Sequence, residues 1–204
     1  MTRRSTELVI DQLPVPSSLV TDAMWVVAFS LVTALCAQWS IPLPFTRVPL
    51  TGQTFGVLLS GALLGWRRGF LSQLLYLAEG AAGLPVFAGA TGTALTLAGP
   101  TGGYLWSFPL AAALAGWLVE HGAGRSRGRL AAALVAADSL ILIAGSTWLH
   151  VQFRVLYSQA WLQGLYPFLV ADFAKVVLLV SSLPRLLRWF DAYWKKGPTG
   201  ADPT

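Results

Sequence analysis

Long apolar stretches, separated by short polar or proline-containing connections, occupy most of the chain. A helix needs about 20 apolar residues to cross roughly 30 Å of hydrocarbon. The pattern predicts an all-α polytopic membrane protein whose membrane domain covers residues 20–189, between polar tails at 1–19 and 190–204. Six transmembrane helices are expected, at Leu19–Ile41, Thr51–Trp66, Gly69–Ala82, Tyr104–Val119, Leu130–Leu149 and Tyr166–Leu187.

The composition agrees with a membrane location. The chain is 55% hydrophobic and 11% charged, with a mean hydropathy of +0.61, whereas soluble domains average roughly 25% charged residues. Residues 1–19 contain no apolar core with a small-residue cleavage site, so we expect a cytoplasmic tail and not a signal peptide. The expected location is the plasma membrane, as a multi-pass protein in the lipid bilayer.

The basic residues divide unequally between the two sides of the six expected helices. Cytoplasmic connections carry an excess of Lys and Arg, so the division places both termini in the cytoplasm. Because the basic residues are spread over short turns, the net charge of +5 indicates topology and not nucleic acid binding. The outer side holds Arg47 and Arg154, and the cytoplasmic side holds Arg3, Arg4, Arg67, Arg68, Arg125, Arg127, Arg129, Arg185, Arg188, Lys195 and Lys196.

Sequence motifs for catalysis are missing. The chain contains no G-x-x-x-x-G-K-[ST] nucleotide-binding loop, no H-E-x-x-H and no G-x-S-x-G. Cys36 is the only cysteine, and His121 and His150 fall in or beside connections on opposite sides. We therefore predict that the protein is not an enzyme and uses no metal ion or cofactor.

The stretch GLPVFAGATGTALTLAGPTGGYL, residues 83–105, carries six glycines and two prolines but no charged residue. Glycine and proline disfavour a helix interior, so irregular backbone is expected here. Irregular backbone within a membrane protein is tolerated where it is buried or lines a cavity. Two interpretations remain open: a tight re-entrant connection that packs helices, or a lid of outer loop over a small-molecule site.

Asp172 and Lys175 are three residues apart in the last expected helix and therefore share one helix face. Ionisable groups inside a span usually pair or bind a ligand. The pair is either a private ion pair that fixes helix packing or a polar anchor in an apolar binding pocket. Around this anchor we expect hydrogen bonds from Tyr104 and Gln53, apolar walls from Phe45 and Phe87, and further contacts from the residues that precede Tyr104, namely Thr101, Gly102 and Gly103.

Two more acidic residues and a small-residue face belong to the expected helices. We expect Glu79 and Asp138 to form hydrogen bonds with neighbouring helices, in structural roles. In the first helix, small residues recur four apart, which lets another helix approach closely. That helix could belong to this protein or to a partner subunit; the pairs are Ser30 with Ala34 and Thr33 with Ala37.

Four segments together resemble the BioY family, the biotin-binding S components of energy-coupling factor transporters. They are LPFTRVPLTGQTFGVLLSGALLG (43–65), YLAEGAAGLPVFAGATG (76–92), GPTGGYL (99–105) and PFLVADFAK (167–175). The Asp and Lys of the last segment match the family pattern. Val170–Ala171 stand where the family usually has Pro–Gly, which predicts a more regular start of that helix, and Arg47 stands where it commonly has another proline.

The resemblance implies high-affinity capture of biotin from the outer side and its delivery inward. It implies two kinds of partner, a transmembrane coupling protein and a pair of cytoplasmic ABC-type ATPases, in agreement with the missing nucleotide-binding loop. It also implies that the small-residue face of the first helix is a docking surface. The alternatives are a stand-alone secondary transporter or channel for biotin or another small carboxylate, and an intramembrane enzyme using Asp138 or Glu79.

Overall fold

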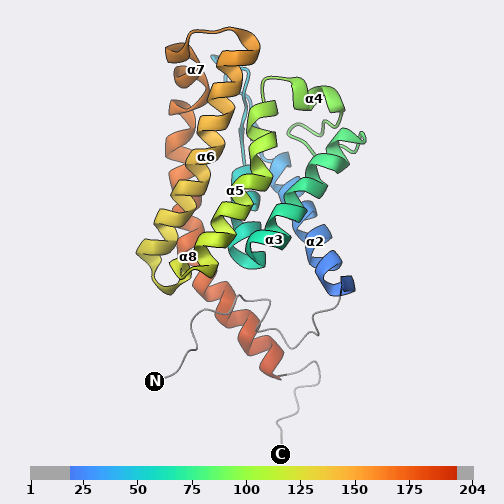
Figure 1. Cartoon of the computed structure of the whole chain (residues 1–204), viewed down its shortest axis with the longest axis vertical. Coiled ribbons are helices and arrows are strands. Elements are labelled where there is room, and N and C mark those ends of the chain that lie inside the picture. The colour runs from blue at the N-terminus through green and yellow to red at the C-terminus, as the bar shows by residue number, and fades with distance from the viewer. Residues whose placement is uncertain (1–18, 197–204) are drawn as a thin grey trace, which may run out of the picture.

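The computed structural model describes residues 19–196, apart from the side chains of Pro184 and residues 186–196. Figure 1 shows the long helices running side by side, with α4 and α7 at one end and the first and last described residues at the other. We call the end that carries α4 and α7 the loop end. The order of elements is α2 (Leu19–Gln38), β1 (Ser40–Ile41), β2 (Leu50–Thr51), α3 (Gln53–Ala81), α4 (Ala94–Ala98), α5 (Gly102–Glu120), the 3₁₀ turn η1 (Ala123–Arg125), α6 (Arg127–Phe153), α7 (Tyr157–Gly164) and α8 (Tyr166–Lys196).

Among the described residues, four helical segments are long and apolar enough to cross a membrane. They match four of the six expected spans, and α3 contains the other two. The expected tail at 1–19 falls outside the described residues except for Leu19. Helix α8 continues past the expected end of the last span, and residues 197–204 also lie outside the described part. The four segments are Leu19–Gln38, Gly102–Glu120, Arg127–Phe153 and Tyr157–Leu183.

Helix α3 is a hairpin of two arms that reverses at Gly65. Gly65 has φ 80° and ψ 177°, in a region of positive φ that favours glycine. The arms, residues 53–64 and 66–81, pack against each other so closely that a Cβ on Gly69 would lie 3.0 Å from the Cα of Gly61. The sequence predicted two helices with a turn at the arginines, and the structure places the reversal at the preceding glycine with no loop.

Helix α5 packs between α3 and α6 in the middle of the bundle (Figure 1). Its small residues Ala111, Ala112 and Ala115 are fully buried. A Cβ on Gly61 of α3 would overlap the carbonyl oxygen of Ala112, so these two backbones are in direct contact. Because apolar side chains gain nothing by leaving lipid, close backbone packing of this kind is a main source of attraction between membrane helices.

The small-residue face of α2 packs inward, against α3. Ser30, Thr33 and Ala37 are fully buried, and the Ser30 hydroxyl donates to Glu79 Oε2 at 2.8 Å. The resemblance implied that these small residues form a docking surface for a partner. That prediction is wrong, because α3 already covers them. Of the two interpretations left open, packing within the protein is the one that the structure supports.

Replacing Ala37 by leucine is expected to lower the folded yield and the thermal stability of the purified protein. Ala37 has no exposed surface, so a larger side chain forces α2 away from α3; such overpacking costs about 1–3 kcal/mol. Leu35→Ala on the exposed face of the same helix is the control and should leave stability almost unchanged. Wild-type stability in Ala37→Leu would show that this face has room for a partner.

The connections at the loop end hold more regular structure than the sequence predicted. The proline-containing connection after α2 forms an antiparallel pair of short strands, with Ser40 opposite Thr51. The glycine-rich stretch, expected to be irregular, contains α4, whose N-terminus is capped by the Thr93 side chain accepting from the Thr96 amide. The connection around Arg154 contains α7. At Val170 and Ala171, α8 is regularly helical, as the sequence predicted.

Candidate functional site

A cavity of about 250 Å³ opens at the loop end of the bundle. Ligand pockets range from roughly 300 to 1,000 Å³, so this volume, just below that range, suits only a small molecule. The lining comes from the β1–β2 hairpin, from the glycine-rich stretch, and from α3, α5, α6 and α8. The lining residues are Arg47, Val48, Pro49, Thr51, Gln53, Thr54, Phe87, Ala88, Thr91, Thr96, Pro100, Thr101, Tyr104, Leu105, Phe108, Ile141, Leu142, Phe168, Asp172 and Lys175.

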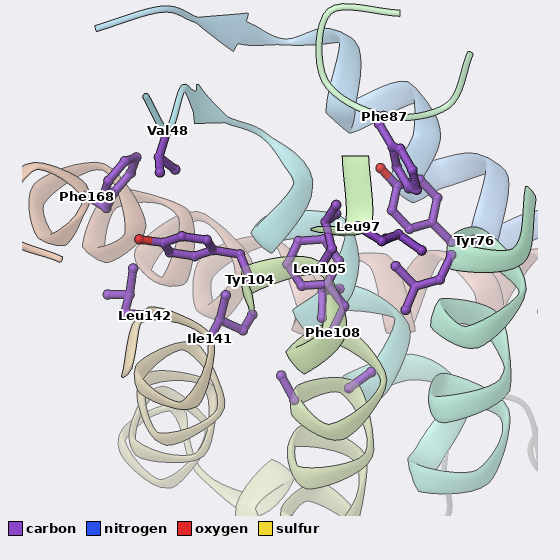
Figure 2. Close-up of a cluster of buried hydrophobic side chains, with 14 of the residues drawn as sticks. Val48, Tyr76, Phe87, Leu97, Tyr104, Leu105, Phe108, Ile141, Leu142 and Phe168 are labelled. Carbon is purple, nitrogen blue, oxygen red and sulfur yellow. The ribbon is translucent and has the colours of Figure 1, made fainter. Parts of the chain in front are cut away.

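The walls of the cavity are mostly apolar and aromatic. Figure 2 shows Tyr104 reaching from α5 toward Phe168 of α8, with Ile141 and Leu142 of α6 on one side and Val48 of the hairpin on the other. The rings of Tyr104 and Phe168 are 6.3 Å apart. Such walls bury the apolar part of a ligand and leave its orientation to a few polar groups.

The glycine-rich stretch is anchored to the bundle by Phe87, which is 1% exposed. Its ring packs edge-on against Tyr76 at 5.4 Å, and it fills a space that a side chain at Gly80 would need. The Tyr76 hydroxyl donates to the carbonyl of Val86 at 3.0 Å. The stretch thus packs on α3, as the first interpretation expects, and it also lines the cavity, while its role as a lid over a ligand stays a prediction.

Asp172 and Lys175 form an ion pair of 2.6 Å between Lys175 Nζ and Asp172 Oδ1. Lys175 also donates to Thr54 Oγ1 at 2.8 Å and to the carbonyl of Thr51 at 2.6 Å. The Thr54 hydroxyl donates in turn to Asp172 Oδ1 at 3.0 Å. This cluster ties α8 to the start of α3 and to the second strand of the hairpin.

Within this cluster Lys175 uses all of its hydrogen-bond donors, whereas Asp172 uses only one of its two oxygens. An ammonium group has three N–H donors and no acceptor, and the three partners of Lys175 use all of them. Both hydrogen bonds to Asp172 end on Oδ1. Among the described residues none donates to Oδ2, so this oxygen has unused acceptor capacity.

Gln53 and Tyr104 line the cavity, but their polar atoms already have protein partners. Gln53 Nε2 donates to the Tyr76 hydroxyl at 2.6 Å, and Gln53 Oε1 accepts from Thr51 at 2.9 Å. The Tyr104 hydroxyl donates to the carbonyl of Gly164 at 2.6 Å. These contacts fix the two side chains in place, and Tyr104 offers the cavity mainly its ring.

Three of the residues predicted from the sequence do not line this cavity. Phe45 is 58% exposed and lies in a separate outer hollow. Gly102 packs against the backbone of Leu97 in α4, and Gly103 lies at the contact between α5 and α6, where an added Cβ would overlap Trp148. The other predicted residues do line it: Gln53, Phe87, Thr101, Tyr104, Asp172 and Lys175.

Several lining residues were not predicted. Thr54 follows Gln53 directly, but a threonine in an apolar helix gives no sequence signal for binding. Phe108 and Phe168 read as ordinary apolar positions of their spans. Arg47 did carry a signal, because it is one of two basic residues in the connections that the sequence predicted to be outer, and its exposed side chain lines the cavity.

Glu79 and Asp138 do not line the cavity. Both oxygens of Glu79 accept from Ser30, so this carboxylate links two helices, as the sequence predicted. Asp138 is buried in α6, and its Oδ1 has no hydrogen-bond partner among the described residues, so the hydrogen bond to a neighbouring helix that we expected for this atom is not found there. Within the same residues, no group of three or more His, Cys, Asp or Glu side chains is placed to hold a metal ion.

Comparison with known proteins gives consistent matches over most of the chain. The model of the BioY family matches residues 4–192. The "Probable biotin transporter BioY" of Pyrococcus horikoshii is 38% identical over 161 residues, 79% of this chain and 93% of that protein. "Biotin transporter BioY2" of Lactococcus lactis is 33% identical over 142 residues, 68% of this chain and 76% of that protein.

One solved structure is similar over 85% of this chain and 94% of its own, with a TM-score of 0.78 and 23% sequence identity. It is the crystal structure of the S-component for biotin from an ECF-type ABC transporter. At this level of identity the likeness establishes a shared fold.

Proposed function

The chain belongs to the BioY family, and from that premise we propose that it is the biotin-binding membrane subunit of a biotin uptake system. The observation that carries the proposal is a small apolar cavity with a single polar cluster, Asp172, Lys175 and Thr54, at one side. Biotin has a neutral ureido head with two N–H donors, an apolar ring and chain, and one carboxylate. The head group suits Asp172 Oδ2, and the ring suits the aromatic walls.

We infer six crossings of the membrane, with the cavity on the outer side. The four long segments and the two arms of α3 together supply the crossings. Both ends of the described chain then lie on one side, and the unequal division of basic residues makes that side cytoplasmic. The loop end, and the cavity with it, face outward.

Cysteine labelling tests this topology. In a Cys36→Ser background, a cysteine at position 127 is expected to react only after the membrane is permeabilised, and one at position 154 is expected to react in intact cells. The difference follows from the excess of basic residues on the side of Arg127. Labelling of position 127 by an external impermeant reagent would reject the six-crossing scheme.

Delivery inward is proposed to need a transmembrane coupling protein and a pair of ABC-type ATPases. The sequence of this chain contains no nucleotide-binding loop that could drive transport by itself. Binding of labelled biotin to the purified protein tests the first half of the proposal, and nanomolar to micromolar binding is expected. Uptake into vesicles that contain ATP, with and without the coupling module, tests the second half.

The alternative is a stand-alone secondary transporter for biotin or another small carboxylate. It predicts uptake in vesicles that lack the ATPases, driven by a proton or ion gradient. Uptake that collapses with the gradient and ignores ATP would favour this alternative, while retained biotin binding would still support the proposed ligand.

A further inference from the structure

Three charged side chains line the cavity: Asp172, Lys175 and Arg47. The first two neutralise each other in their ion pair. The lining therefore keeps one net positive charge, contributed by Arg47. A ligand with a single negative charge would neutralise it.

Lys175 is poorly placed to bind that negative charge. Its three N–H groups already donate to Thr51, Thr54 and Asp172. A carboxylate near Lys175 would have to displace one of these acceptors, and it would also lie close to the carboxylate of Asp172. The anionic end of a ligand is thus expected away from the Asp172–Lys175 pair.

Arg47, unlike Lys175, is well placed to bind a negative charge. It lies between the two strands of the hairpin, is exposed, and its guanidinium carbon lies 5.9 Å from the ring centre of Phe153. This cation–π contact leaves the N–H donors of the guanidinium available, and their planar fork matches a carboxylate. No acidic side chain among the described residues forms an ion pair with Arg47.

Arg47 also lies where the cavity meets a second, outer hollow of about 460 Å³. Phe45 and Phe153 line this hollow, and Arg47 lines both spaces. A ligand that fills the inner cavity with its apolar ring would extend its flexible chain past Arg47. The carboxylate at the end of such a chain would reach the guanidinium at the junction.

We propose that Arg47 binds the ligand carboxylate, while Asp172 accepts hydrogen bonds from the neutral head at the inner side. This inference rests on the proposed function, since it takes biotin as the ligand. It fixes the orientation of the ligand, with the head inward and the carboxylate outward. It also makes Arg47 the residue that selects for an acidic ligand.

A comparison of biotin with biotinamide, in which a neutral carboxamide replaces the carboxylate, tests the proposal on the purified full-length protein. Wild type is expected to bind biotin more tightly than biotinamide. Arg47→Gln should weaken biotin binding about tenfold. This is the lower end of the effect expected for losing a hydrogen bond to a charged group, because the site is exposed. Its affinity for biotinamide should stay within about twofold of wild type. Arg47→Lys should restore part of the biotin affinity.

Arg154→Gln is the matched control. It removes the other basic residue of the outer connections, and Arg154 is exposed without lining either space. Biotin affinity in this variant should remain at the wild-type value. If Arg154→Gln weakened biotin binding as much as Arg47→Gln, the effect would be a general attraction of anions to the outer surface, and the specific contact would be rejected.

The remaining outcomes separate the inference from the proposed function. Wild-type biotin affinity in Arg47→Gln would overturn the inference and leave the proposed function intact. An equal loss of biotin and biotinamide binding would also overturn it, because Arg47 would then support the shape of the cavity through Phe153. If Arg47→Gln slowed the association of biotin and left its dissociation rate unchanged, Arg47 would act only by long-range electrostatic steering, and the direct contact would be rejected. If wild type bound neither compound, the proposed function would fail and the inference with it.

Discussion

Replacing Asp172 by asparagine, or Lys175 by methionine, is expected to weaken biotin binding by roughly ten- to a hundredfold. Losing a hydrogen bond to a charged group costs about 1.5–3 kcal/mol. An asparagine side chain has one oxygen and one NH₂ group. It would therefore offer a donor in place of one of the two acceptor oxygens of Asp172, where the N–H groups of the ligand need an acceptor. The methionine side chain would release Asp172 Oδ1 and the Thr51 carbonyl, so that the hairpin loses its tie to α8. Equilibrium binding of labelled biotin measures both effects.

The double variant, Asp172→Asn with Lys175→Met, distinguishes a ligand anchor from a private ion pair. If the two residues serve only helix packing, removing both charges relieves the stranded partner, and binding and yield should recover. If they anchor the ligand, the double variant folds but binds biotin no better than the weaker single variant. Affinity near wild type in the double variant would therefore overturn the proposed site.

Asp22→Asn is a suitable control for these substitutions. Asp22, in the first turn of α2, pairs with Arg68 at 2.7 Å, and neither residue lines the cavity. Neutralising Asp22 removes an ion pair of similar length without touching the ligand site. Biotin affinity should remain unchanged, and a comparable loss would indicate that ion pairs act on binding through the stability of the whole bundle.

Replacing Gly103 by alanine is expected to lower the stability of the folded protein by about 1–3 kcal/mol or more. The added Cβ would overlap Trp148 and would lie 2.9 Å from the carbonyl oxygen of Ala144, a backbone atom that cannot move aside alone. Trp148 is also held by a hydrogen bond of 3.0 Å from its indole to the carbonyl of Gly99. The thermal stability of the purified protein measures the loss.

Gly128→Ala supplies the matched control for Gly103→Ala. Gly128 lies in the first turn of α6, and a Cβ there would meet nothing within 4 Å. Alanine favours a helix over glycine by about 1 kcal/mol, so the stability of this variant should stay equal or rise. If Gly103→Ala kept its full stability but lost biotin binding, Gly103 would belong to the binding site after all.

The sequence could predict features that depend on the type and spacing of residues within one segment. It could not predict features that depend on which two segments come into contact. Asp172 and Lys175 were predictable, because charged residues three apart in an apolar helix have few roles. The partner of the small residues in α2 was not predictable, since spacing shows close approach but not which helix approaches. Phe45 and Phe87 look alike in sequence; only the fold places Phe87 inside, through Tyr76 and Gly80.

Backbone geometry accounts for most of what the sequence could not predict. The reversal at Gly65 depends on one positive φ value, which glycine permits but does not require. The contact of Gly103 with Trp148 depends on the register of α5 against α6. In both cases, glycine in an apolar stretch indicated a special role without indicating which one.

In the six-crossing arrangement that we propose, the reversal within α3 would also affect the lipid around the protein. At 1.5 Å per residue, the arm 66–81 extends over about 24 Å, against roughly 30 Å of hydrocarbon. Leu71 and Leu74 of this arm are half-exposed, so in the proposed arrangement they would face the acyl chains. We expect the bilayer beside them to thin by several ångströms, a mismatch that costs fractions of a kcal/mol per ångström. The protein should accordingly favour membranes with shorter acyl chains, and Arg67 and Arg68 should draw headgroups and water inward at the turn.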